Sequence, residues 1–289
     1  MKKIILLLLI VIIANQLNAQ SLEEKIAIRA CECLKSKSKV TEDVYTKCIS
    51  NSVAEVVLKE SDPKNREVIN TVEGIQGLFK KVYALMPQTC EKEKKKERDA
   101  IKEAFYSYSK NERAQNSYII AKDFMRDEKY DLAIEGLQMA LKQDKKFVLA
   151  YDDIAVCYRH LNDFDNAIKY YKKSLEIYPE GDFALTNIGV VYALKSDYKT
   201  ATEYYEKLIK FHPENPEGYF GAGKNYFLVN DYEKALNNIF IAHRIYTEEK
   251  SAYIKDTEQI IGMMYKKLKE ENKEALFNTI AEKNNIKTN

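Results

Sequence analysis

The chain has 289 residues, with 46 Lys and Arg against 44 Asp and Glu. Removal of Lys2 and Lys3 with an amino-terminal signal would leave 46 − 2 = 44 basic residues against 44 acidic ones, and no stretch of the sequence forms a basic stripe. A protein that binds nucleic acid needs a basic surface for the phosphates, so this class of partner is not supported.

Residues 1–19 have the features of a cleaved secretory signal. Lys2 and Lys3 precede an apolar run, Ile4–Ala14, that is too short to span a bilayer, and Ala19 supplies a small residue before the cut. We therefore expect Gln20 to begin the mature chain; an uncleaved anchor is the alternative. The protein is expected to be exported, to the periplasm or the extracellular space, with no stable membrane insertion after cleavage.

Residues 20–110 predict a small helical domain that does not share the pattern of the following segment. Ser21 and Thr41 each begin a helix-capping pattern ahead of spaced apolar residues. Asp62-Pro63 is expected to start a third helix, which Pro87 ends, and a fourth helix is expected from about Gln88.

This segment holds four of the five cysteines, Cys31, Cys33, Cys48 and Cys90. In an exported protein such a group indicates two disulfides. Cys31 and Cys33 point about 200° apart around a helix, so they reach different neighbours. Of the three possible pairings we favour Cys33 with Cys48 and Cys31 with Cys90. A redox centre and a zinc site are less well supported, because the Cys-x-x-Cys motif and paired zinc knuckles are absent.

From residue 114 to 249 one pattern returns every 34 residues, in copies at 114–147, 148–181, 182–215 and 216–249. A fixed period of this length is typical of a helical repeat array, in which each helix pair buries its apolar face against the next pair. Stacked helix hairpins are therefore predicted. Small residues recur at two positions where paired helices approach closely. They are Ala121, Ala155, Gly189 and Gly223 in the first helix of each copy, and Ala133, Ala167, Ala201 and Ala235 in the second.

The turns of the copies agree with helix hairpins. Asn162-Asp163 and Asn230-Asp231 combine a residue that tolerates the left-handed conformation with one that can cap the next helix; Ser196-Asp197 takes the same place. Pro179 and Pro213 are expected to stop the second helix of their copies. Cys157, within one of the helices, is interpreted as a small buried hydrophobic residue.

These positions resemble the tetratricopeptide repeat: the small residue of the first helix, the aromatic three residues later, the aromatic after the turn and the Ala three residues after that. The resemblance implies an all-α fold, a right-handed α-solenoid whose first helices line a concave groove for a partner's peptide or helix. Carried over by position, the groove-facing candidates are Tyr118, Lys122, Met125, Asp152, Val156, Arg159, Thr186, Asn187, Val190, Phe220, Lys224 and Phe227.

Residues 250–289 keep helical spacing of apolar residues but lose the small residues of the repeat. A repeat array needs an end with one packed and one solvated face, so capping helices are predicted here, the first from about Ser251.

No catalytic signature is recognisable in the chain. His160, His212 and His243 stand in different copies without metal-ligand spacing, and the adjacent Asp152 and Asp153 point to different sides of a helix. We therefore expect no enzyme activity, no metal and no cofactor, and an exported scaffold that binds a protein or peptide. The alternatives are a thiol redox protein that uses Cys31 and Cys33, with the repeats recruiting its substrate, and a structural component of an envelope or secretion assembly.

Overall fold

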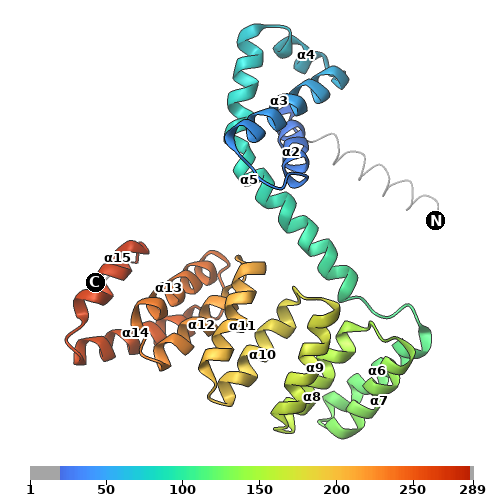
Figure 1. Ribbon diagram of the computed structural model, residues 1–289, viewed down its shortest axis with the longest axis vertical. Helices are drawn as coiled ribbons and strands as arrows, with labels where there is room; N and C mark the ends of the chain where they lie inside the picture. The colour runs from blue at the N-terminus through green and yellow to red at the C-terminus, as the bar shows by residue number, and fades with distance from the viewer. Residues whose placement is uncertain (1–19, 287–289) are drawn as a thin grey trace. The chain divides into compact units, whose positions relative to one another are not determined.

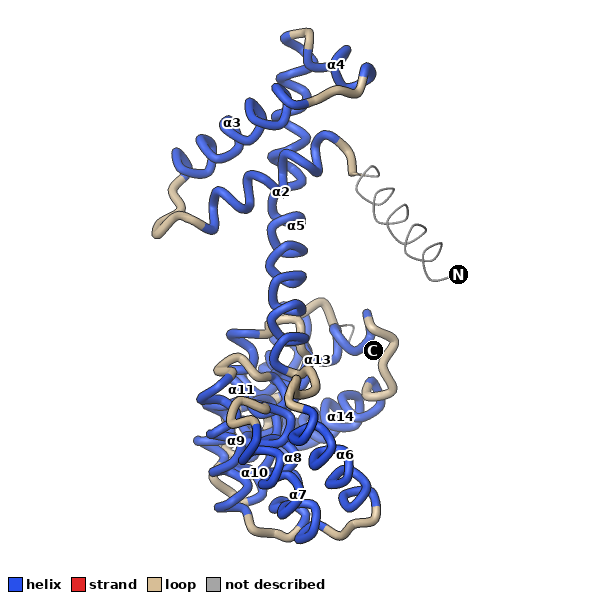
Figure 2. Tube along the Cα trace, turned by 90° about the vertical axis from the view of Figure 1, so that its right-hand side faces the viewer, coloured by secondary structure: helices blue, strands red, loops and turns tan. Residues whose placement is uncertain are grey.

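The computed structural model describes residues 20–286, and this part of the chain consists of helices and loops without a strand (Figure 2). The signal predicted over residues 1–19 lies outside the described residues. The helices divide into two units, one ending at Lys102 and one beginning at Glu103. In the described range no helix is both long and apolar enough to cross a membrane.

From residue 20 onward, the first unit contains four helices around a small apolar core. They are α2 (Leu22–Lys35), α3 (Glu42–Lys59), α4 (Pro63–Ile69) and α5 (Val72–Phe105), and α5 continues into the second unit. The Ser21 hydroxyl accepts from the backbone N–H of Glu24, whose carboxylate accepts from Ser21 in return; this reciprocal cap starts α2. Ile26, Ile49 and Val82 bring α2, α3 and α5 into one fully buried cluster.

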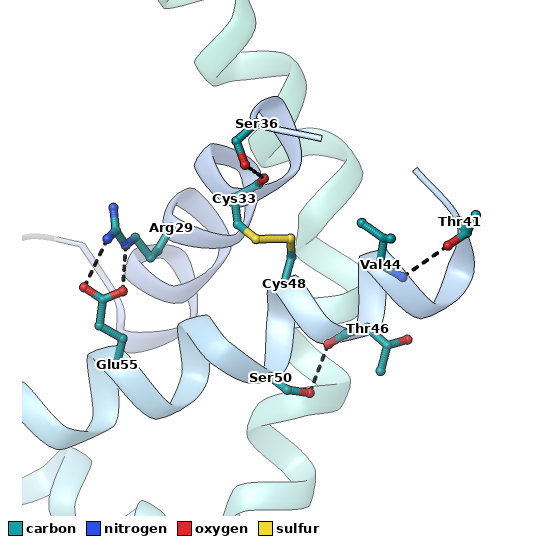
Figure 3. Close-up of a disulfide and its surroundings, with 9 residues drawn as sticks. All are labelled: Arg29, Cys33, Ser36, Thr41, Val44, Thr46, Cys48, Ser50 and Glu55. Carbon is teal, nitrogen blue, oxygen red and sulfur yellow. Dashed lines mark hydrogen bonds and ion pairs between the residues drawn. A yellow bond between two sulfur atoms is a disulfide. The ribbon is translucent and has the colours of Figure 1, made fainter. Parts of the chain in front are cut away.

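Two disulfides join these helices. Cys31 is bonded to Cys90 and Cys33 to Cys48, which is the pairing favoured above among three. Figure 3 shows the Cys33–Cys48 bond between α2 and α3, with the guanidinium of Arg29 paired to the Glu55 carboxylate on the same two helices.

The expectation that Pro87 ends a helix was wrong. Pro87 lies inside α5, and the break falls instead at Asn70 and Thr71, where the Thr71 hydroxyl accepts from the backbone N–H of Gly74 and caps α5. Proline removes one hydrogen bond from a helix interior, at a cost of about 3 kcal/mol. Tertiary contacts on both sides offset this cost, because Met86 is fully buried and Cys90 is bonded to α2.

Up to residue 286, the second unit contains four helix hairpins and two further helices, which follow one another in a row in Figure 1. The hairpins are α6 (Glu112–Arg126) with α7 (Tyr130–Gln143), α8 (Val148–His160) with α9 (Phe164–Ile177), α10 (Asp182–Leu194) with α11 (Tyr198–Phe211), and α12 (Pro216–Leu228) with α13 (Tyr232–Glu248). The last helices are α14 (Ile254–Glu270) and α15 (Glu274–Lys283).

The turn inside each hairpin has the same conformation. Asn162, Ser196 and Asn230 have φ values of 60°, 60° and 62°, and the Asp that follows each one caps the next helix. In the first hairpin Glu128 takes this conformation, with φ 59°, and its second helix has no side-chain cap. The 34-residue spacing therefore fixes the turn even where the residue type is unfavourable.

Packing between the two helices of a hairpin depends on the small residues. A Cβ atom on Gly223 would lie 2.7 Å from Ile239 and 3.2 Å from the Ala235 carbonyl oxygen, so only a glycine allows this approach. Aromatic pairs repeat as well. Tyr158 stacks on Tyr170, and Tyr192 on Tyr204, both with ring centroids 5.6 Å apart.

Each end of the array is joined to non-repeating chain. At the carboxyl end, Phe240 of α13 packs against Phe277 of α15 at 5.7 Å between ring centroids. At the amino end, Phe105 stacks on Tyr178 at 4.7 Å, and the Ser109 hydroxyl donates to Asp144. Both contacts lie within the second unit, which begins at Glu103.

Candidate functional site

A cleft of about 370 Å³ lies between α10 and α12, the first helices of the last two hairpins. We call it the first-helix cleft. Its lining residues are Thr186, Val190, Ala193, Leu194, Tyr198, Tyr205, Glu217, Phe220, Gly221, Lys224, Asn225 and Leu228. Four of the groove-facing residues proposed from the sequence are therefore brought together here: Thr186, Val190, Phe220 and Lys224.

The lining of the first-helix cleft is mainly apolar. Val190 and Leu194 come from α10, and Phe220 and Leu228 from α12; Leu194 and Leu228 are more than half exposed. A Cβ atom on Gly221 would lie 2.4 Å from the Tyr205 ring, so the absence of a side chain there lets this ring reach the backbone of α12. Such a surface can accept an apolar or aromatic side chain.

Two polar side chains on α12, Asn225 and Lys224, can orient a bound peptide. The Asn225 side chain is 3% exposed, and its amide nitrogen finds no acceptor among the described residues. A buried donor without a partner costs about 1–3 kcal/mol, which an acceptor on a bound chain would recover. Lys224 is exposed at the rim, with Nζ 5.2 Å from the centroid of the Phe220 ring, and can pair with a carboxylate.

Asn225 is not among the groove-facing candidates named from the sequence, but a comparison of the repeat copies distinguishes it. Shifted back by 34 and 68 residues, its position is occupied by Val191 and Cys157, both fully buried. Asp123, which is exposed, takes the position in the first copy, so Asn225 is the polar side chain that is buried there. Glu217 and Leu228 carried no comparable signal, since neither residue is unusual on the surface of a first helix.

The remaining candidates lie elsewhere in the array. Tyr118 is buried, and its hydroxyl donates to the Asp153 carboxylate at 2.7 Å; Lys122 donates to the same carboxylate at 2.9 Å. Asp152 is also buried, with 2% exposure. The half-buried ones are Met125, Val156, Arg159, Asn187 and Phe227. Tyr118 and Lys122 thus take part in polar contacts within the first two hairpins, and Asp152 lies in their interior.

Asp152 has an unusual environment for a carboxylate. Burial raises its pKa to about 7; the hydroxyls of Ser174 and Tyr106 act in the opposite direction, and the charges of Asp153 and Asp182 raise it further. The folded chain therefore holds this proton more tightly than the unfolded chain, in which the pKa is near 3.8.

Stability of the second unit is expected to fall as pH rises from 5 to 7. A raised carboxyl pKa contributes stability that is complete below the unfolded pKa and is lost as pH rises through the folded one, with a slope of at most about 1.4 kcal/mol per pH unit. Urea unfolding of the wild type and of Asp152→Asn at several pH values measures this contribution. The slope of the variant should be shallower between pH 5 and 7; identical slopes would refute the assignment to Asp152.

The cysteines do not form an exposed thiol pair. Cys31 and Cys33 are bonded to different partners, so they do not make a redox disulfide with each other. Cys157 is a free, fully buried thiol, and burial raises its pKa to about 12, which keeps it protonated at neutral pH. The geometry thus gives no support to the thiol redox alternative.

Comparison with known proteins agrees with the repeat architecture. Residues 147–214 match the tetratricopeptide repeat family. The structure is similar to that of MamA, residue 41 to the end, from Desulfovibrio magneticus RS-1, at 18% identity and a TM-score of 0.51, covering 61% of this chain and 95% of that one. A MamA RS-1 double mutant gives 19% identity, 61% and 97% coverage, and a TM-score of 0.51. A search of curated proteins finds no match.

At these identities the likeness concerns the fold. The second unit has the architecture of a tetratricopeptide-repeat solenoid, and residues 20–286 are all-α with a disulfide-linked helical unit before the array.

Proposed function

We propose that this chain is an exported scaffold that binds an extended segment of a partner protein in the first-helix cleft. The observation that carries this proposal is the buried amide of Asn225, which lines an apolar cleft and has no acceptor among the described residues. A peptide laid along α12 offers backbone carbonyls at regular spacing, and one of these can accept from Asn225 once its side chain turns toward the cleft.

The partner's chemistry follows from the lining. Phe220, Val190 and Leu228 favour an apolar or aromatic anchor, because such side chains in desolvated pockets dominate binding energy. Lys224 favours a carboxylate next to the anchor, and Glu217 already accepts from the Tyr246 hydroxyl at 2.5 Å, so its charge is partly engaged. The preferred segment is therefore an apolar residue with an acidic neighbour.

Export is supported by the cysteine chemistry of the first unit. Disulfides persist in oxidising compartments and are rare in reducing ones, and the first unit carries two of them. Together with the basic and apolar amino terminus, they favour a periplasmic or extracellular site of action.

A double substitution in the cleft should abolish partner capture. Leu228→Ala with Lys224→Glu removes an apolar contact and reverses the rim charge, and both side chains are exposed, so the fold should be unaffected. In crosslinking from the native envelope fraction with the full chain as bait, we expect recovery of the principal partner to fall at least about tenfold, the effect of 1.4 kcal/mol.

The matched control is Leu132→Ala with Lys142→Glu. It makes the same two changes at exposed positions of α7, outside the cleft. This control should capture the partner as the wild type does. Equal capture by the cleft variant and the control would contradict the proposed site.

A further inference from the structure

A second cleft, of about 520 Å³, lies on the second helices of the array and is separate from the first-helix cleft. We call it the second-helix cleft. Its lining residues are Lys172, Leu175, Glu176 and Pro179 at α9 and its end, Leu185 of α10, and Tyr204, Lys207, Lys210 and Phe211 of α11. It shares no residue with the first-helix cleft, so the function proposed above leaves it unexplained.

Its floor is apolar and recessed. Leu185 is 1% exposed, and Leu175 and Phe211 are half-buried beside it. A single side chain from a peptide can enter the hollow, because the cleft volume lies within the range of ordinary ligand pockets.

The rim is positively charged. Lys172, Lys207 and Lys210 oppose the single carboxylate of Glu176, and none of the three lysines forms an ion pair with a carboxylate within residues 20–286. They lie near aromatic rings instead. The distances from Nζ to the ring centroid are 4.6 Å for Lys207 on Tyr204, 5.7 Å for Lys210 on Phe211 and 6.0 Å for Lys172 on Tyr192.

Two lysines elsewhere in the array are paired with carboxylates, whereas Lys169 and Lys173 also lie near an aromatic ring, that of Tyr170. Lys195 pairs with Asp165 at 2.5 Å, and Lys234 with Asp231 at 3.3 Å. The charges of the three lysines in the second-helix cleft are thus available to an incoming anion. Because the lysines surround one apolar hollow, they can pair with carboxylates on both sides of an inserted apolar side chain.

We propose that the second-helix cleft docks an acidic peptide segment. The segment inserts one apolar side chain over Leu185, and its carboxylates pair with Lys172, Lys207 and Lys210 around the rim. The array then holds two peptides at once, one on its first helices and one on its second helices, and brings their parent proteins together.

The test uses the full chain and a defined probe. The probe is a fluorescein-labelled ten-residue peptide with six Asp and Glu residues around a central Leu-Phe pair, and its binding is followed by anisotropy at low and moderate salt. Lys172→Glu with Lys207→Glu should weaken binding at least tenfold. The matched control, Lys169→Glu with Lys199→Glu, changes exposed lysines of the same two helices outside the cleft and should bind within twofold of the wild type.

Further measurements identify the class of ligand and the surface that binds it. A probe with Asn and Gln in place of the acidic residues should bind at least tenfold more weakly, and added salt should weaken the acidic probe. The proposal is overturned by equal losses in the two lysine variants, which would indicate general charge attraction. It is also overturned if phosphatidylglycerol vesicles bind through Lys172 and Lys207 while the peptide does not.

The first-helix cleft provides the last control. Leu228→Ala with Lys224→Glu should bind the acidic probe within twofold of the wild type, because three lysines line the second-helix cleft and only Lys224 lines the first-helix cleft. If this variant loses the probe and the Lys172 and Lys207 variant keeps it, the probe occupies the first-helix cleft; the second docking site is then refuted while the proposed function stands.

Discussion

Replacing Phe240 by Ala is expected to lower the free energy of unfolding of the second unit by about 3–5 kcal/mol. Phe240 is 1% exposed and lies in the cluster that joins the last hairpin to α14 and α15. The substitution removes the edge-to-face contact with Phe277 and leaves a cavity among Leu236, Met264 and Ile280, none of which can move far in a closely packed core.

Hydrogen exchange during guanidinium unfolding measures this effect unit by unit. The same substitution at Phe183, which is 41% exposed on α10, serves as the control and should cost no more than about 0.5 kcal/mol. A Phe240→Ala chain as stable as Phe183→Ala would show that α14 and α15 do not close the array.

Loss of the Cys31–Cys90 disulfide should destabilise the first unit by about 4 kcal/mol. The bond closes a loop of 59 residues, and the entropy of closing a loop of that length in the unfolded chain gives roughly this value. The Cys33–Cys48 bond closes only 15 residues, so its loss should cost about 3 kcal/mol. The double substitutions to Ser are compared by exchange protection of α2, α3 and the first half of α5.

The second unit provides the internal reference for the two disulfide variants. Its exchange protection should stay unchanged, since both bonds lie within the first unit. A larger cost for removal of the shorter loop would contradict the entropic account and would point to contacts of Cys33 and Cys48 in the folded state.

The repeat architecture was predictable because several independent features of the sequence indicate the same structure. Period, small residues and turn residues at positions such as Asn162 and Ala167 all specify the same helix hairpin. The first hairpin shows how strong this agreement is: Glu128 adopts the left-handed conformation although its side chain does not favour it, because packing of α6 on α7 fixes the turn.

The features that could not be predicted depend on contacts between residues that are distant in sequence. Pro87 remains inside α5 because a disulfide and buried side chains hold the helix on both sides, and nothing near Pro87 in the sequence indicates this. The groove-facing residues transferred by position were brought together in the cleft only on α10 and α12. On α8, Asp152 is buried instead, because Tyr106, from a segment with no repeat counterpart, lies against it.

Cys157 gives the protein a built-in reporter of local opening. It is the single cysteine of the five that is not oxidised, and it lies fully buried in the first helix of the second hairpin. A thiol reagent can modify it only when that hairpin opens, so the rate of labelling reports the free energy of opening at this one place. Ligand binding to the array can thus be followed by ordinary thiol chemistry, without any introduced probe.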